Sequence, residues 1–435
     1  MVILSYKVES GSPIFAFLSS PTLSRSSQNL NFRNRSPFFI LTFLRAINNE
    51  FSNFSEYKVL RDQDWLSQLI DRRGTHSTKW EKYKDRDILP FWVADMDYET
   101  PAFILDAVKE RLCHPILGYS EDPESLTEAL RTWLLKSYDW SIKSEWVVWL
   151  PGVVSGLNVA CRMIDSDKRV MVPTPSYHPF LELAKNSNKQ EIRVPLKLVE
   201  DRWEMDFSLM REHIDQTGVL AISNPQNPTG RAYTEGELRN LSSILLEKDL
   251  LILSDEIHCP LIIDETKNHI PLAKLDASLL SRTITFYGAT KAYNMPGLGC
   301  AAAVIPDDSV RERFQKASSG LLPSIGPLNY AATEAALRDT SSWIDTLNRR
   351  LRQNYEDLKQ VTGDRITNVE ATYLAWIYVG DLKQRDPKEY FEQYGLGLSW
   401  GEQFGDPDYV RFNFAAPRET LNEGLQRLKQ ALQDI

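Results

Sequence analysis

The stretch TITFYGATKAYNMPGLGCAAAV, residues 283–304, places a single lysine, Lys291, between two apolar runs. The first run, residues 283–287, is rich in strand-forming residues, and a turn of small residues connects it to the lysine. A lysine between buried segments loses hydration, which lowers the pKa of its amine from the ordinary value of about 10.4. The pattern therefore predicts a nucleophilic amine that can form a Schiff base with an aldehyde.

Short apolar runs alternate with amphipathic segments on both sides of this stretch. We expect strands within residues 145–152, 168–177, 218–230, 250–258, 282–289 and 299–306. A helix is expected from residue 153, and another from Thr234, where Thr-Glu-Gly-Glu offers a capping box. Strands that are apolar on both faces and separated by helices indicate a mostly parallel central sheet flanked by helices. In such sheets ligands bind at the carboxyl ends of the strands.

The composition limits the class of protein. Of the 435 residues, 42% are hydrophobic and 25% are charged, which is typical of a globular chain with more than one structural unit. The net charge of -9 argues against a nucleic-acid binder, and no apolar run reaches the roughly 20 residues that cross a membrane. The four cysteines form no CxxC pair, so we expect buried free thiols and no metal site.

The chain divides into four parts by its pattern. They are an N-terminal extension, 1–55; a segment that packs with the smaller domain, 56–94; a large domain, 95–325; and a small α+β domain, 326–435, with helices at 328–339 and 341–361, a strand within 371–379 and a terminal helix from Glu419. The extension is rich in serine and arginine, which is typical of an organelle transit peptide, but a disordered or misassigned extension fits equally. We expect a cytoplasmic protein, or an imported one if the extension is a transit peptide.

Polar residues close several of the expected strands. Asp255 ends an apolar strand, where a carboxylate is costly unless a cation or a hydrogen bond compensates; a helix cap or a structural ion pair is the alternative. Asn227 follows another strand, either in a simple turn or as an amide donor at the same sheet edge. Tyr177 follows a third strand, where it either packs on the surface or stacks on a flat ring.

The turn PGVVSGL, residues 151–157, precedes the first expected helix. The backbone N–H groups around Val153, Val154 and Ser155 lie at the positive helix end and suit a phosphate, which Thr290 would also contact. Together, the Schiff-base lysine, a carboxylate for a ring nitrogen, an amide for a phenolic oxygen and a phosphate cradle predict a site for pyridoxal 5′-phosphate (PLP).

The motifs in which these residues lie resemble those of a known family. NPQNPTG, SDEIH and ATKAYNMPGL resemble the fold-type-I PLP-dependent enzymes of the class I/II aminotransferase superfamily. DRRGTHSTKW (71–80), LPFWVADMDYETP (89–101), HPILGY (114–119), ATYLAW (371–376) and YVRFNFAAPR (409–418) are similar to its cystathionine β-lyase-type carbon–sulfur lyases. The resemblance implies the α/β fold of the PLP-dependent transferases of type I, with a mostly parallel central sheet and a smaller α+β domain.

The same resemblance implies a role for each residue around the ring of the cofactor. Lys291 would carry the cofactor as a Schiff base and later move a proton. Asp255 would keep the ring nitrogen protonated, and Asn227 would meet the ring oxygen. Tyr177 would stack on the ring, and His258 would lie near the ring oxygen, where many relatives have a tyrosine.

It also implies the contacts of the phosphate and of the substrate. Val153, Val154 and Thr290 would bind the phosphate. Tyr119 would reach that phosphate from a neighbouring subunit, which implies a homodimer with shared active sites. Arg411 would bind the α-carboxylate of the substrate with its forked guanidinium.

The expected activity is a PLP-dependent α,β-elimination. The substrate would be cystathionine, cysteine or a related S-conjugate, and the products pyruvate, ammonia and a thiol. No arginine follows Lys291 within fifteen residues, although many aminotransferases have one there, and this favours the lyase subgroup. A PLP-dependent aminotransferase is the alternative, and a regulatory or binding protein on a lyase scaffold is a third hypothesis. We expect a small sulfur amino acid as partner, and no nucleic acid, membrane or metal.

Overall fold

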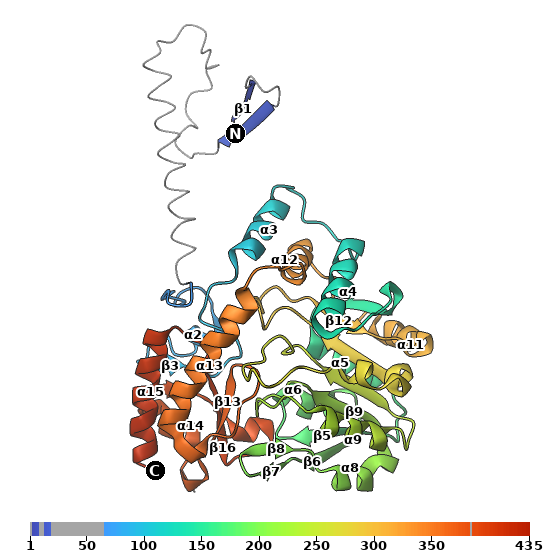
Figure 1. The fold of residues 1–435 in the computed structure, drawn as a ribbon, viewed down its shortest axis with the longest axis vertical. Coiled ribbons are helices and arrows are strands. Elements are labelled where there is room, and N and C mark those ends of the chain that lie inside the picture. The colour runs from blue at the N-terminus through green and yellow to red at the C-terminus, as the bar shows by residue number, and fades with distance from the viewer. Residues whose placement is uncertain (1, 8–12, 19–64, 383–384) are drawn as a thin grey trace. The chain divides into compact units, whose positions relative to one another are not determined.

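The computed structural model describes two parts of the chain separately. It covers residues 2–7, 13–18, 65–382 and 385–435, and the chain divides into two compact units, Met1–Asp64 and Trp65–Ile435 (Figure 1). In the first unit, β1 (Val2–Lys7) and β2 (Pro13–Leu18) pair antiparallel. The rest of the predicted extension, including its boundary at residue 55, lies outside the described residues. The boundaries expected after residues 94 and 325 stay predictions.

A seven-stranded sheet forms the centre of the second unit. Its order is β4 (Val147–Leu150), β12 (Ala301–Val304), β11 (Thr283–Tyr287), β10 (Leu251–Asp255), β9 (Thr217–Ser223), β5 (Arg169–Thr174) and β6 (Glu191–Pro195). Only β12 runs antiparallel to its neighbours, so the predicted mostly parallel sheet is confirmed. The edge strand β6 was not predicted, because its residues alternate between buried and exposed and form no apolar run.

Helices cover both faces of this sheet (Figure 1). In β5, Val170 and Val172 join an apolar cluster with α5 (Val153–Arg162) and α11 (Asp308–Ser318). Met171, between them, joins a second cluster with α8 (Phe207–His213) and α9 (Glu235–Leu245). Because strand side chains alternate between faces, each strand supplies both clusters, and this explains its apolar sequence. The predicted capping box is present at Thr234, the N-cap of α9.

The C-terminal region forms a second, smaller layered region. Its antiparallel sheet has the order β13 (Leu374–Tyr378), β16 (Tyr409–Asn413), β15 (Ser399–Trp400), and its helices are α13 (Trp343–Thr362), α14 (Pro387–Gln393) and α15 (Arg418–Gln433). The preceding helix, α12 (Pro327–Leu337), packs instead against α3 (Ala102–Leu112) and α4 (Glu124–Tyr138). The first strand of the second unit, β3 (Leu89–Pro90), pairs with β14 (Leu396–Gly397). This pairing anchors the chain near residue 90 to the C-terminal region. The segment after β3 then runs toward the strand ends of the large sheet.

Further α-helices and a hairpin belong to the second unit. They are α2 (Thr78–Glu81), α3 (Ala102–Leu112), α4 (Glu124–Tyr138), α6 (His178–Leu181), α7 (Leu183–Asn186), α10 (Leu272–Leu275) and the hairpin β7 (Lys197–Val199)–β8 (Arg202–Glu204). No helix of the described ranges is both long and apolar enough to cross a membrane.

The cysteines differ from the prediction at one position. Cys161, Cys259 and Cys300 are buried free thiols, as expected, but Cys113 is exposed. It is the C-cap of α3 and is followed by an exposed stretch of chain, so no segment of the described ranges covers it.

Two glycines give opposite predictions for stability. A Cβ at Gly156 in α5 would lie 2.5 Å from Phe286 Cε1 and 2.6 Å from Leu150 Cδ1. Gly156→Ala should therefore lower the free energy of unfolding by about 1–3 kcal/mol, the usual effect of overpacking. Gly236→Ala is the matched control, because Gly236 is an exposed position of α9 where a Cβ meets nothing within 4 Å, and the change should stabilise the protein by a few tenths of a kcal/mol. Urea unfolding measures both, and equal values for the two variants would contradict this account.

Candidate active site at the strand ends

A cavity of about 250 Å³ lies at the carboxyl ends of the central strands. It brings together the predicted residues Val153, Val154, Tyr177, Asn227, Asp255, His258, Thr290 and Lys291. A cavity of roughly 150 Å³ holds one benzene ring, so this one accommodates a substituted aromatic ring. These residues meet because they follow parallel strands, whose carboxyl ends share one edge of the sheet.

Lys291 lies in this cavity with a perturbed amine. Its Nζ donates to the Ala94 carbonyl at 2.8 Å, and the Tyr373 hydroxyl donates to the same oxygen at 3.0 Å. Burial and, secondly, the charge of Arg411 lower the pKa of Lys291 to about 8, and the charges of Asp95 and Asp255 oppose the shift. More of the free base is therefore present near neutral pH than for an ordinary lysine, as the sequence predicted.

Asp255 ends β10 as a buried carboxylate that is 8% exposed. Its Oδ1 accepts from the Ile257 backbone N–H at 3.1 Å, and among the described residues no side chain forms an ion pair with it. Burial raises the pKa of Asp255 to about 7, against the effects of the Ile257 N–H and Lys291. A cation bound in the cavity would favour the charged form of this carboxylate.

Arg411 and Asn227 connect the small sheet with the large one. Arg411 on β16 donates from Nη1 to Asn227 Oδ1 at 2.9 Å and from Nη2 to the Trp92 carbonyl at 2.8 Å. Since a guanidinium can only donate, the bond fixes the amide with Oδ1 toward Arg411. The Asn227 NH₂ group is then left to donate to another acceptor.

Arg411 itself is a buried cation that lacks an anionic partner. It is 4% exposed, its guanidinium lies 4.7 Å over the Phe404 ring, and in the described chain no carboxylate pairs with it. Its Nε is buried without a hydrogen-bond partner. Burial lowers the pKa of Arg411 to about 10. A buried guanidinium with an orphaned donor is suited to bind a carboxylate of a ligand.

The first turn of α5 faces the cavity beside these charges. Gly152, Val153, Val154 and Ser155 line the cavity, and the first N–H groups of a helix have no intrahelical acceptor. No side chain of the described residues caps this helix, and Ser155 Oγ is itself a donor to the Gly152 carbonyl at 2.9 Å, so the first backbone N–H groups remain for a ligand. Together with Thr290 they form a site that favours an anion.

Two aromatic side chains complete the wall of the cavity. His258 is buried, and burial with the charges of Lys291 and Arg411 holds its pKa well below the ordinary value, so the ring is neutral. Its Nδ1 has no hydrogen-bond partner in the described chain. Tyr177, the residue before α6, is partly buried. Both rings are available to a ligand.

Tyr119 and Arg411 are predicted residues that do not line the cavity. Arg411 lies outside the lining of the cavity, and it donates a hydrogen bond to Asn227, which does line it. Tyr119 is 100% exposed, on a stretch between α3 and α4. The single chain therefore does not bring Tyr119 to the other predicted residues.

The segment that covers Lys291 is not among the predicted site residues. The Ala94 carbonyl binds Lys291, and the Val93 and Asp95 carbonyls each accept from Asn413 Nδ2 at 2.6 Å. We call residues 92–98 the strap. Its sequence carries only the family resemblance, because a backbone carbonyl leaves no signal in side-chain chemistry.

Ion pairs hold the strap in place. Arg72 Nη2 lies 2.6 Å from Asp95 Oδ2, and Lys79 Nζ lies 2.7 Å from Asp97 Oδ2. The Lys79 side chain is completely buried, and Asp97 is nearly so. Ion pairs therefore join segment 71–80 to segment 89–101. They hold the strap, and with it the Ala94 carbonyl, in position.

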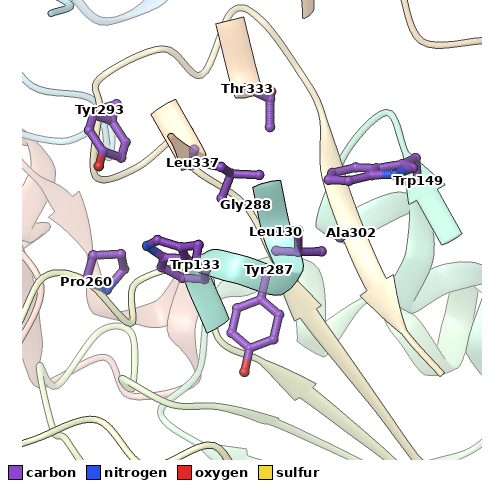
Figure 2. Close-up of a pocket in the computed structure, with 11 residues that line it drawn as sticks. Leu130, Trp133, Trp149, Pro260, Tyr287, Gly288, Tyr293, Ala302, Thr333 and Leu337 are labelled. Atoms are coloured by element: carbon purple, nitrogen blue, oxygen red, sulfur yellow. The ribbon is translucent and has the colours of Figure 1, made fainter. Parts of the chain in front are cut away.

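A second cavity lies behind Gly288 and does not fit a ligand. Figure 2 shows its mostly apolar lining, which includes Trp133, Trp149, Tyr287 and Tyr293. Its volume is about 10 Å³, which is room for at most one water molecule.

Comparison with known proteins identifies relatives over most of the chain. A family model described as aminotransferase class I and II matches residues 86–428. Cystathionine beta-lyase PatB of Bacillus subtilis (strain 168) is 30% identical over 384 residues, which cover 83% of this chain and 98% of the relative.

Solved structures agree with this result. The PLP-bound C-S lyase from Staphylococcus hominis is 31% identical, with a TM-score of 0.79 over 84% of this chain and 97% of that chain. The crystal structure of OvoB is 38% identical, with a TM-score of 0.81 over 85% of this chain and 99% of that chain. The predicted fold class, that of the PLP-dependent transferases of type I, is confirmed.

The charge of Arg411 should be measurable at Lys291. In the cofactor-free protein, Arg411→Met removes a positive charge and should raise the pKa of Lys291 above about 8. The pH midpoint for modification of Lys291 by an amine-reactive reagent, read by peptide mass spectrometry, should move upward. Arg239→Met, which removes an exposed arginine of α9, is the control and should leave the midpoint unchanged. A midpoint that stays at the wild-type value in Arg411→Met would show that Arg411 does not act on this amine.

Proposed function

This chain belongs to the aminotransferase class I and II family, and from that premise we propose that it is a PLP-dependent carbon–sulfur β-lyase. The reaction is the α,β-elimination of cystathionine, cysteine or a related S-conjugate to pyruvate, ammonia and a thiol. One observation carries the proposal: Asp255 and Arg411 are buried charges without ion-pair partners in the described chain, next to a lysine of lowered pKa. The relatives named as cystathionine β-lyase and C-S lyase support the choice of reaction.

The residues of the cavity fit PLP group by group. Asp255 would pair with the ring nitrogen, and Lys291 would bond to the aldehyde carbon. The Asn227 amide would donate to the phenolic oxygen, and Tyr177 would lie against the ring. The first turn of α5, with Thr290, would hold the phosphate. When bound, PLP supplies an electron-poor ring that takes up the electron pair left by loss of a substrate proton.

The chain supplies substrate binding and proton transfer. Arg411 would bind the α-carboxylate, because its Nε lacks a partner and its Nη groups now hold only neutral acceptors. The Lys291 amine, with its lowered pKa, would remove the α-proton of the substrate. His258 is neutral, so it would add no further positive charge beside Lys291 and Arg411. Transamination shares the removal of this proton, and elimination requires in addition that the β-sulfur leaves.

We also propose that the enzyme is a homodimer in which Tyr119 completes the phosphate site of the neighbouring subunit. Leu112, Ile116, Leu117 and Tyr119 are all exposed on one short stretch, and such apolar stretches are typical of interfaces. Tyr119→Phe should weaken PLP binding about tenfold, the effect of one lost hydrogen bond to a charged group, and leave the native mass unchanged. Equilibrium dialysis and sedimentation measure the two quantities. A native mass of one chain with full PLP affinity would contradict the proposal.

A substrate panel tests the reaction. Purified protein with PLP should release one pyruvate per L-cystathionine or L-cysteine consumed, without any added keto acid. Lys291→Ala is the control and should release none above the rate of free PLP. Turnover that requires a keto acid would identify an aminotransferase instead. A preparation that binds PLP, turns over no substrate and retains a protein partner would favour the scaffold hypothesis.

A further inference from the structure

A buried carboxylate beside Asp255 has no part in the chemistry described so far. Glu256 directly follows Asp255 at the end of β10 and is 0% exposed. It does not line the cavity. A glutamate in such a place is costly unless every lone pair has a donor, so its surroundings indicate what it does.

The surroundings of Glu256 consist of hydrogen-bond donors from several elements. Oε1 accepts from Ser254 Oγ at 2.9 Å and from the Leu272 backbone N–H at 3.3 Å. Oε2 accepts from the Tyr287 hydroxyl at 2.6 Å and lies 2.8 Å from His269 Nε2. Glu256 thereby ties the end of β10, which carries Asp255, to the end of β11, which leads into the Lys291 loop.

The hydrogen bonds favour an ionised Glu256. If Glu256 carried a proton and donated it to His269 Nε2, the ring proton would sit on His269 Nδ1, which has no partner in the described structure. A buried orphaned donor is expensive, so His269 Nε2–H is the donor. With the Leu272 N–H and the hydroxyls of Ser254 and Tyr287, it gives the two Glu256 oxygens four donors, an arrangement that suits an acceptor-only carboxylate.

Other titratable groups near Glu256 add no charge. Burial raises the pKa of Tyr287 and of Tyr138 on α4 well above the ordinary value, and it raises that of Cys259 in the same way. These groups are neutral near pH 7. His269 could neutralise Glu256 only with both ring nitrogens protonated, and a proton on its buried Nδ1 would be a donor without a partner in the described structure. The described surroundings therefore supply Glu256 with hydrogen-bond donors, and its negative charge acts on Asp255.

We propose that Glu256 is a positioning residue that fixes the strand end carrying Asp255 and strengthens the hold of Asp255 on a cationic ring nitrogen through its own buried negative charge. The inference rests on the proposed function, because the ring nitrogen is that of PLP. Two carboxylates at one strand end make a site that binds a proton or a cation more tightly than one does. Glu256 touches neither the cavity nor a substrate, so it acts through Asp255.

The cofactor-free protein tests the electrostatic part without any catalytic step. Burial and the charge of Glu256 both raise the pKa of Asp255, which lies at about 7. Glu256→Gln keeps the shape of the side chain and removes its charge. The pH midpoint of the Asp255 titration should therefore fall by on the order of one pH unit. The carboxyl ¹³C signal of Asp255, assigned as the one lost in Asp255→Asn, measures that midpoint.

Tyr287→Phe is the matched control for a purely structural role. It removes one hydrogen bond to Glu256 and leaves the charge in place. Both variants should lower the melting temperature, but only Glu256→Gln should move the Asp255 midpoint. An unchanged midpoint in a folded Glu256→Gln protein would overturn the proposal. If that variant does not fold, Glu256→Asp replaces it: it keeps the charge, so its midpoint should stay near the wild-type value, and a fall would overturn the proposal.

A second readout joins the inference to the cofactor. With ¹⁵N-labelled PLP bound, the ring nitrogen signal of Glu256→Gln should move toward that of an unprotonated pyridine, and kcat should fall about tenfold with little change in KM. A wild-type ¹⁵N shift in this variant would overturn the proposal. If the wild-type protein does not bind PLP, the proposed function is refuted. The Asp255 titration in the cofactor-free protein would still decide whether Glu256 acts on Asp255.

Discussion

The structure depends on charges that are buried around one cavity and not neutralised by one another. Lys291, Asp255 and Arg411 hydrogen-bond to backbone groups and to a neutral amide, and none of them forms an ion pair within the described chain. Each such group is unfavourable when buried without a partner, and each has a shifted pKa that reflects this cost. These unpaired charges lower the stability of the free protein. A ligand with complementary charges would offset that loss when it binds in the cavity.

The fold places these charges through ordinary elements. Parallel strands bring Asp255 and the loop of Lys291 to one edge, and the small sheet supplies Arg411 from β16. The bond from Arg411 to Asn227 joins the two sheets at the cavity. The strap, residues 92–98, lies across the same edge and contributes the Ala94 carbonyl that holds Lys291. Motion of the small region relative to the large sheet would therefore change the site itself, because both regions contribute groups to it.

Much of this site could be predicted from the sequence, because its signals are local. Asp255 and Lys291 each follow an apolar run, and the ends of such runs meet in a parallel sheet. The partners of these residues could not be predicted in the same way. The Lys291–Ala94 bond spans 197 residues and ends on a backbone carbonyl. The Arg411–Asn227 bond spans 184 residues, and only the fold brings those two side chains together.

The covalent bond between Lys291 and PLP is the premise on which the account of the site rests. Purified protein is incubated with PLP, reduced with borohydride, digested and analysed by peptide mass spectrometry. We expect one reduced phosphopyridoxyl group per chain, on the peptide that carries Lys291, and no label in Lys291→Ala. Label on another lysine in the wild-type protein, or its persistence in Lys291→Ala, would contradict the assignment of this cavity as the PLP site.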